Sequence, residues 1–459
     1  MEYKLENGWN KIEDKEVVFN FCEGYKNYLN TAKTERECID EAVRLAVESG
    51  FKPLESFATL KAGDKVYAIN RDKSAVFAII GEEKVSSGLN IIGSHVDAPR
   101  LDLKQKPLYE DGELAFFKTH YYGGIKKYQW TAVPLALHGV VIKENGEKVK
   151  VCIGEEQDDI TFVITDLLPH LAREQMKKEP SKIIEGEDLN ILIGSMPLKD
   201  TEKDGVKAGI LKLLNEKYGI CEEDFLSAEL EAVPAARAKD VGFDRSLIGA
   251  YAHDDRVCAY PSLLAIFNSH NCKKTALCLL TDKEEIGSMG NTGAKSRFMQ
   301  LVVSEILEKT GEGSSNLNLF RTLDNSVCLS ADVSAAFDPN FANVYDKLNC
   351  SKTGYGLSIC KYTGAGGKYD SSDASAELVY KVRKLLNDNG VIWHTSELGK
   401  TDMGGGGTIA QYMANLGVDT IDCGVPVLSM HAPFEIVSKL DVYMAYEGFY
   451  AFYNQGENK

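Results

Sequence analysis

Long apolar runs are absent from this sequence of 459 residues. A membrane helix needs roughly 18 consecutive apolar residues, whereas the stretch from Val133 to Ile142 is short and contains His138. The first residues also carry no apolar segment of the secretory type. We therefore expect neither a membrane-spanning nor a secreted protein.

Positive charge is in deficit, with 52 Lys and Arg against 68 Asp and Glu and a formal net charge of −16. Because such a surface repels phosphate groups, we expect no nucleic-acid partner and no binding to anionic membrane surfaces. The 11 cysteines are odd in number, and no two form a C-x-x-C pair. Neither a disulfide framework nor a cysteine zinc site is indicated, and a reduced, cytoplasmic location is expected.

Two common catalytic motifs are missing. Gly399-Lys400-Thr401 has His394 where a phosphate-binding P-loop needs its first glycine. Ser288 has Ile286 where the G-x-S-x-G motif of serine hydrolases needs glycine. Neither kind of chemistry is indicated.

Short apolar runs that end in acidic or imidazole residues organise much of the chain. Four such runs read as buried strands: Leu89–Gly93, Ala276–Leu280, Val327–Ala331 and Val425–Leu428. A helical pattern over Glu35–Ser49 precedes them, and another over Val257–Phe267 lies between them. Because α/β sheets bind ligands beyond the carboxyl ends of their strands, we expect the four runs to deliver their polar residues to one edge. The predicted class is α/β, with a mixed central sheet flanked by helices.

The segment 104–237 differs from its surroundings, with tyrosine pairs, charged stretches and few polar groups at strand ends. We interpret it as an inserted, β-rich second domain that interrupts a first domain formed by 1–103 and 238–459. The alternative is one continuous irregular domain.

His95-Val96-Asp97 and Glu284-Glu285 are the first candidates for chemistry. Residues two apart in an extended chain point to the same side, so Asp97 would lie beside His95, as second-shell carboxylates do beside metal-binding histidines. Adjacent extended residues point to opposite sides, so one glutamate could hold a metal while the other addresses a water molecule. Alone, the first motif is more often a structural histidine and the second a solvated surface.

Asp254, Asp332 and His431 complete the set. Each has an ordinary alternative: a helix cap, a turn residue and a buried histidine, respectively. Together with His95 and the glutamates, they make a mixed nitrogen and oxygen donor set that suits a pair of zinc, manganese or cobalt ions.

In the order of these motifs, the chain resembles the M18 family of co-catalytic metallo-aminopeptidases, over nearly its whole length. The matching segments are Ser94–Pro99, Asp254–Arg256, Glu284–Gly287, Ser330–Asp332 and Met430–Glu435. The resemblance implies hydrolysis of the N-terminal residue from peptides by two divalent ions, with zinc expected. It also implies a homo-oligomer, up to a dodecamer, assembled through the inserted domain.

The resemblance also implies a role for each residue. Asp254 would bridge the ions, His95 and Asp332 would complete one metal site, and Glu285 and His431 would complete the other. Asp97 would orient His95, and Glu284 would be the general base. The substrate-contacting positions would be His170, Lys361 and Tyr369. The segment Pro169-His170-Leu171-Ala172 matches one in which the family contributes a histidine to a neighbouring subunit's site, and that histidine corresponds to either His170 or Glu174.

One departure concerns specificity. Aspartyl members carry a further histidine after the Asp332 motif, where this chain has Val333-Ser334-Ala335-Ala336. Acidic and neutral N-terminal residues therefore both stay open as substrates. Two other functions also stay open: a related di-metal carboxypeptidase or deacylase, and a non-catalytic peptide-binding assembly protein on the same scaffold.

Overall fold

The computed structural model describes residues 4–155 and 159–455. It divides into two compact units. The first consists of Met1–Asp97, Ala238–Met430 and Glu435–Lys459, and the second of Ala98–Arg237 and His431–Phe434. The residue at which we predicted the insertion to begin, 104, lies inside a strand of the second unit, β5 (Arg100–Asp111).

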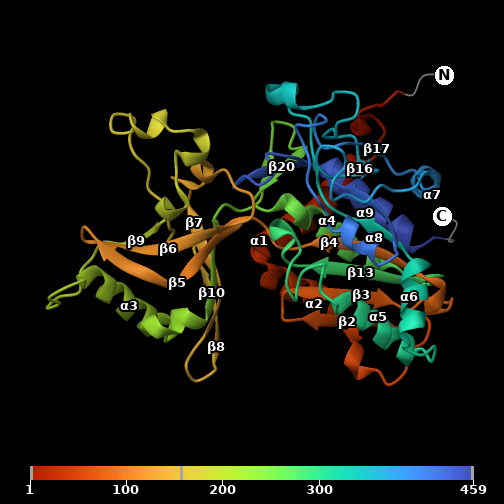
Figure 1. Ribbon diagram of the computed structural model, residues 1–459, viewed down its shortest axis with the longest axis horizontal. Helices are drawn as coiled ribbons and strands as arrows, with labels where there is room; N and C mark the ends of the chain where they lie inside the picture. The colour runs from red at the N-terminus through yellow and green to blue at the C-terminus, as the bar shows by residue number, and fades with distance from the viewer. Residues whose placement is uncertain (1–3, 156–158, 456–459) are drawn as a thin grey trace. The chain divides into compact units, whose positions relative to one another are not determined.

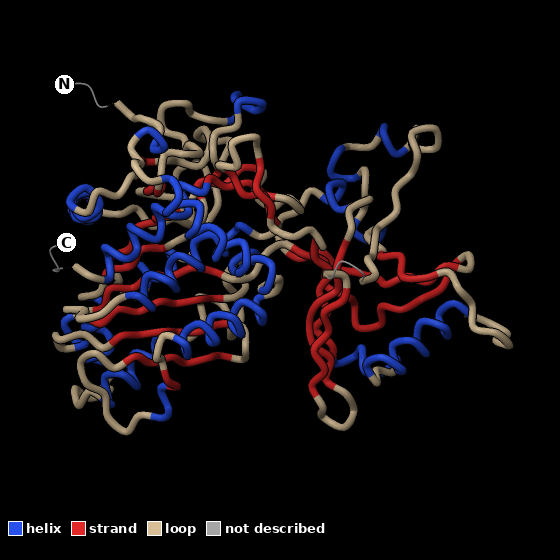
Figure 2. Tube along the Cα trace, turned by 180° about the vertical axis from the view of Figure 1, so that it is seen from behind, coloured by secondary structure: helices blue, strands red, loops and turns tan. Residues whose placement is uncertain are grey.

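A nine-stranded mixed sheet forms the centre of the first unit (Figures 1 and 2). Its four middle strands, β13, β4, β14 and β18, run parallel to one another. In spatial order the strands are β1 (Lys52–Pro53), β2 (Lys65–Asn70), β3 (Ser74–Ile79), β13 (Thr275–Thr281), β4 (Leu89–His95), β14 (Val327–Ser330), β18 (Asp419–Gly424), β16 (Leu357–Cys360) and β17 (Trp393–Thr395).

Both faces of this sheet are covered by helices, which confirms the predicted fold class. Along β13, Ala276 and Cys278 point into one core while Leu277 and Leu279 point into the other, as the two-residue period of a strand requires. The first core is shared with α1 (Lys15–Thr31), α2 (Glu35–Glu48), α4 (His253–Asn268), α7 (Ala376–Asp388) and α9 (Lys439–Tyr453). The second is shared with α5 (Phe298–Lys309), α6 (Asn316–Asp324) and α8 (Ala410–Asn415).

A separate five-stranded sheet also belongs to the first unit. It has the order β11 (Lys239–Val241), β12 (Leu247–Ala250), β20 (Glu435–Ser438), β19 (Pro426–Leu428) and β15 (Ser334–Ala335). Three of the four predicted strands lie in the large sheet, but Val425–Leu428 contributes β19 to this small one. The expectation that all four runs end at one edge of a single sheet was therefore wrong, because a short apolar run does not reveal which sheet it joins.

The second unit is built on a six-stranded antiparallel sheet. Its order is β8 (Lys148–Ile153), β7 (Leu135–Ile142), β10 (Ala228–Pro234), β5, β6 (Leu114–Tyr122) and β9 (Ile191–Gly194). Helix α3 (Gly205–Tyr218) packs against β5, β6 and β9 (Figure 1).

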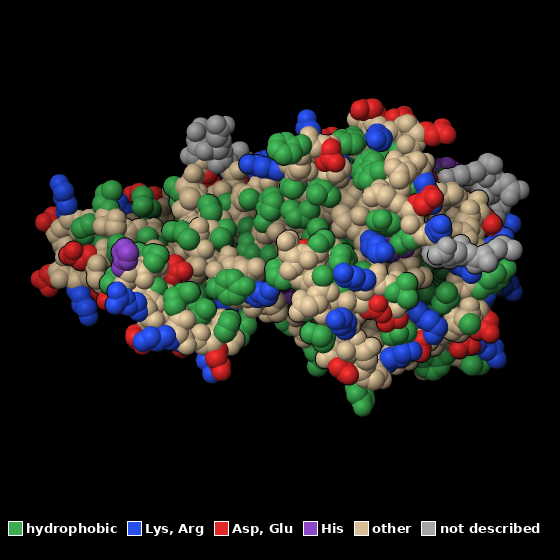
Figure 3. Space-filling model, turned by 90° about the horizontal axis from the view of Figure 1, so that it is seen from above, with side chains coloured by type: hydrophobic (Ala, Val, Ile, Leu, Met, Phe, Trp, Pro, Cys, Tyr) green, Lys and Arg blue, Asp and Glu red, His purple; other side chains and the backbone are tan. Residues whose placement is uncertain are grey.

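Exposed apolar side chains are frequent on the second unit, and Figure 3 shows such side chains among charged ones at the molecular surface. Among the described residues between β8 and β9, five large apolar side chains are at least half exposed: Ile160, Leu167, Leu168, Leu171 and Met176. Within the described residues, no helix combines the length and the apolar character needed to cross a membrane.

Candidate metal centre

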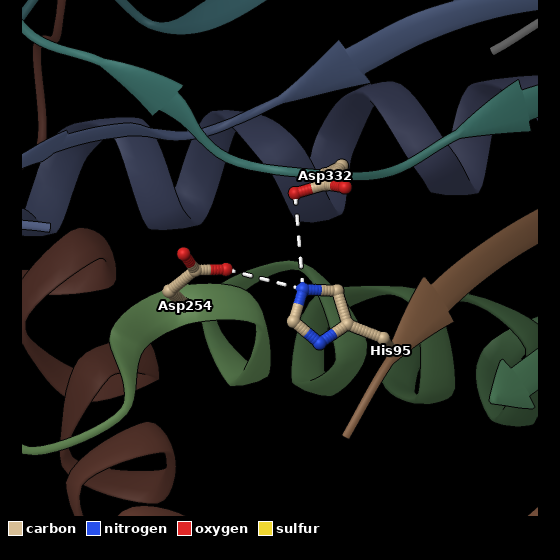
Figure 4. Close-up of side chains that lie close together, drawn as sticks. All are labelled: His95, Asp254 and Asp332. Carbon is tan, nitrogen blue, oxygen red and sulfur yellow. Dashed lines mark hydrogen bonds and ion pairs between the residues drawn. The ribbon is translucent and has the colours of Figure 1, made fainter. Parts of the chain in front are cut away.

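His95, Asp254 and Asp332 converge in the interior of the first unit (Figure 4). The Nε2 atom of His95 lies 3.1 Å from Oδ1 of Asp254 and 3.9 Å from Oδ1 of Asp332. One donor atom from each residue lies within 4.8 Å of the other two, and all three residues are buried. Such a group of three can hold one metal ion.

Sheet topology explains why these residues meet. His95 is the last residue of β4, and Asp332 follows the end of the parallel neighbour β14. Asp254 lies at the beginning of α4, just after β12. Two of the three donors are therefore at the carboxyl edge of the sheet, where α/β sheets bind ligands.

The electrostatics of the cluster favour a cation. Burial raises the pKa of Asp332 well above its ordinary value, and the neighbouring charge of Asp255 raises it further. Burial likewise raises the pKa of Asp255. Several acids thus share a low-dielectric space in which their ionised forms are costly. A divalent ion would relieve this repulsion, and an imidazole with carboxylates is a donor set that zinc accepts.

Asp97 contacts two of the predicted motifs at once. Its Oδ1 lies 3.3 Å from Nδ1 of His95, beside the imidazole as expected. The same Oδ1 accepts a hydrogen bond from the backbone N–H of Glu284 at 3.1 Å, and Oδ2 accepts one from the N–H of Glu285 at 3.2 Å. Asp97 is fully buried. Its carboxylate therefore contacts the backbone of the glutamate pair as well as the histidine ring.

We predicted an extended chain at Glu284 and Glu285, and the structure shows that this was wrong. They begin a short 3-10 helix, η9 (Glu284–Ile286), after Lys283 in the left-handed region at φ 66°. The left-handed residue turns the chain sharply after β13, and the sequence pattern did not reveal this turn. Donor atoms of Glu285 and Asp254 lie within 4.8 Å of each other, so Asp254 is close to another potential ligand besides His95 and Asp332.

His431 lies in the short segment His431–Phe434, which groups with the second unit. Its backbone is in the left-handed region at φ 64°, and its Nδ1 lies 2.8 Å from the carbonyl oxygen of Gly124. If Nδ1 carries the proton and donates to this carbonyl, Nε2 is left with the lone pair that a metal ligand needs.

The three predicted substrate contacts lie in different places. His170 is exposed in the second unit. Lys361 and Tyr369 belong to a glycine-rich loop of the first unit, where Lys361 forms an ion pair with Asp373. Tyr369 is largely exposed.

Sequence reasoning missed three supporting residues. Oδ2 of Asp255 accepts a hydrogen bond from the backbone N–H of His95 at 3.2 Å. The buried guanidinium of Arg256 donates to the carbonyl of Val96 at 3.4 Å. A Cβ at Gly424 would clash with the backbone of Asp332, so only glycine fits there. The Asp254–Arg256 motif was the available signal for the first two, whereas Gly424 had none.

An α/β sheet with buried imidazole and carboxylate donors at its carboxyl edge is typical of metal-dependent enzymes. Comparison with known proteins makes this specific. Residues 28–453 match the family model of the aminopeptidase I zinc metalloproteases, M18. The chain belongs to this family, and it is an aminopeptidase.

Relatives match over the full length. A probable M18 family aminopeptidase 1 from Clostridium acetobutylicum is 52% identical over 460 residues, covering 99% of this chain and 98% of its own length. The crystal structure of an M18 aminopeptidase from Thermotoga maritima superposes with a TM-score of 0.96 at 46% identity, over 99% of this chain and all of that one. Aminopeptidase I from C. acetobutylicum superposes with a TM-score of 0.93 at 50% identity, with the same coverage.

Proposed function

We propose that this aminopeptidase works with two divalent ions that share Asp254. The observation that carries the proposal is the position of Asp254, whose carboxylate is near His95 and Asp332 and also near Glu285. In this proposal His95 and Asp332 complete the first ion site, and Glu285 and His431 complete the second. Zinc is the ion named for the family, and manganese or cobalt would suit the same donors.

His431 is assigned to the second site by chain connectivity. The residues on either side of its segment, Met430 and Glu435, belong to the first unit. They lie in and after the turn between β19 and β20, two antiparallel strands of the small sheet. The turn is short, so His431 cannot move far from these strands.

Glu284 is proposed as the general base. When bound, the ions would lower the pKa of a water molecule and polarise the scissile carbonyl. Glu284 would accept the proton of that water and pass it to the leaving amine, so that one peptide bond and one water molecule become a free amino acid and a shortened peptide. Asp97 would orient His95 and fix the backbone of Glu284 through the contacts described above.

The substrates are proposed to be peptides with a free N-terminus, contacted by His170, Lys361 and Tyr369. A homo-oligomer is also proposed: a Saccharomyces cerevisiae structure with the same fold, at 21% identity and a TM-score of 0.76, is described as a dodecamer. A cytoplasmic location is supported by the cysteines, all 11 of which are free thiols.

Metal removal tests the function. A chelator should abolish release of the N-terminal residue from free peptides, and zinc, manganese or cobalt should restore it. The N-acetylated form of each peptide is the matched control and should stay intact, since a carboxypeptidase or deacylase would still process it. Full activity of thoroughly demetallated protein, or equal cleavage of the acetylated peptides, would contradict the proposal.

A further inference from the structure

Glu435 is a buried acid that neither the proposed ligand set nor the proposed base includes. It is the first residue of β20, and only 1% of it is exposed. Its Oε2 accepts a hydrogen bond from the backbone N–H of Asp254 at 3.0 Å. In the small sheet, Glu435 lies opposite Ala250 of β12, the strand that leads into α4.

The backbone of Asp254 needs such a partner. Asp254 lies in the first turn of α4 with non-helical angles, φ −79° and ψ 109°. N–H groups in the first turn of a helix have no acceptor within the helix, and a buried N–H without an acceptor is costly. The Glu435 carboxylate supplies the acceptor and holds the backbone of the residue whose side chain faces His95.

The same side chain connects Asp254 to the proposed ligand His431. Glu435 ends the turn between β19 and β20 in which His431 lies. Anchoring Glu435 to Asp254 therefore fixes one end of that turn relative to α4.

A packing role does not explain a glutamate at this position. With only 1% of the residue exposed, a carboxylate here costs desolvation. Its gain is a charge-assisted hydrogen bond, which is stronger than a neutral one and holds the N–H in a narrower geometry.

We propose that Glu435 is a positioning residue of the metal centre, which sets the affinity for divalent ions by fixing the backbone of Asp254 and the turn that carries His431. The inference rests on the proposed two-ion function. It concerns a residue outside the proposed ligand set.

Cobalt titration of the demetallated full-length protein tests the inference, with the visible absorption of bound Co²⁺ as the readout. Glu435→Ala removes the acceptor and should weaken cobalt binding about 10- to 100-fold, as losses of outer-shell partners do. Glu435→Gln keeps an oxygen that accepts from Asp254 but loses the charge, so its loss of cobalt affinity should be smaller than that of Glu435→Ala. If Glu435→Ala does not fold, Glu435→Asp, one methylene shorter, replaces it and should also weaken binding.

Glu312→Ala is the matched control. Glu312 also accepts backbone N–H groups, those of Val85 and Ser86 at 2.7 and 3.0 Å, but it belongs to no proposed ligand motif. This variant should lose stability and keep its cobalt affinity. Unchanged affinity in Glu435→Ala, an equal loss in Glu312→Ala, or a full loss in Glu435→Gln would overturn the inference. Failure of the unaltered protein to bind two equivalents of cobalt would instead contradict the proposed function.

Discussion

At the residue scale, the centre is organised by carboxylates that act on backbone groups as well as on side chains. Asp97 accepts hydrogen bonds from the backbone N–H groups of Glu284 and Glu285. Asp255 accepts a hydrogen bond from the backbone N–H of His95. Because these contacts hold the main chain, each donor reaches the centre with little freedom left. Preorganisation of this kind reduces the entropy that metal binding and catalysis would otherwise lose.

Changing Glu284 or Glu285 to glutamine should affect metal content and turnover differently. Glu285→Gln replaces a charged ligand by a weaker neutral one, so metal content and activity should fall together. Glu284→Gln removes only the proton acceptor, so it should keep its metal while turnover drops by at least about 10²–10⁴-fold. Metal analysis beside steady-state kinetics measures both. Metal loss in Glu284→Gln with retention in Glu285→Gln would reverse the two roles, and full activity of both would make the pair an ordinary surface.

At the element scale, a buried histidine joins strand β17 to the loop before β16. Nε2 of His394 accepts the N–H of Lys352 at 3.0 Å, so Nδ1 carries the proton and donates to the carbonyl of Tyr355 at 3.2 Å. Burial lowers the pKa of His394 to about 4. Protonation of Nε2 would break the bond from Lys352, so the fold requires the neutral ring.

The stability of the fold should therefore depend on pH through His394. Below about pH 6.5 the unfolded state binds a proton at this histidine that the folded state does not bind. The contribution of His394 to the free energy of unfolding is therefore fully present above about pH 6.5 and is lost as the pH falls toward about 4. The loss should reach at most about 3 kcal/mol. Chemical unfolding in the presence of a chelator, at several pH values, measures it. His394→Gln should flatten this dependence, and His270→Gln, at an exposed position, should not. An equally steep dependence in His394→Gln would contradict the assignment.

At the scale of the whole molecule, the segment of the second unit between β8 and β9 exposes large apolar side chains. Leu171 and Met176 are 68% and 69% exposed. Contiguous exposed apolar patches usually mark an interface. They support the proposed assembly through the inserted segment.

Light scattering should accordingly find an oligomer at micromolar concentration. Leu171→Glu and Met176→Glu place charge on the proposed interface and should shift the protein to smaller species. Leu301→Glu, at a position 58% exposed on α5 of the first unit, is the control and should leave the mass unchanged. A monomeric unaltered protein, or dissociation by the control alone, would contradict the proposal.

The sequence by itself determined the local elements and the chemical types of the site. The helix expected over Glu35–Ser49 is α2, and three of the short apolar runs became β4, β13 and β14. The ordered motifs indicated the M18 family, and the family comparison confirms it. Periodicity and residue type suffice here because they depend on contacts near in sequence.

Only the tertiary structure decided what depends on distant contacts. It placed Val425–Leu428 in the small sheet, turned Glu284 and Glu285 into a 3-10 helix, and brought Glu435 to the N–H of Asp254. Glycine at 424 is required only because the backbone of Asp332 lies against it. The physical reason is common to all four: sheet membership, turn geometry and buried hydrogen bonds are fixed by packing between segments far apart in the chain, which no local pattern records.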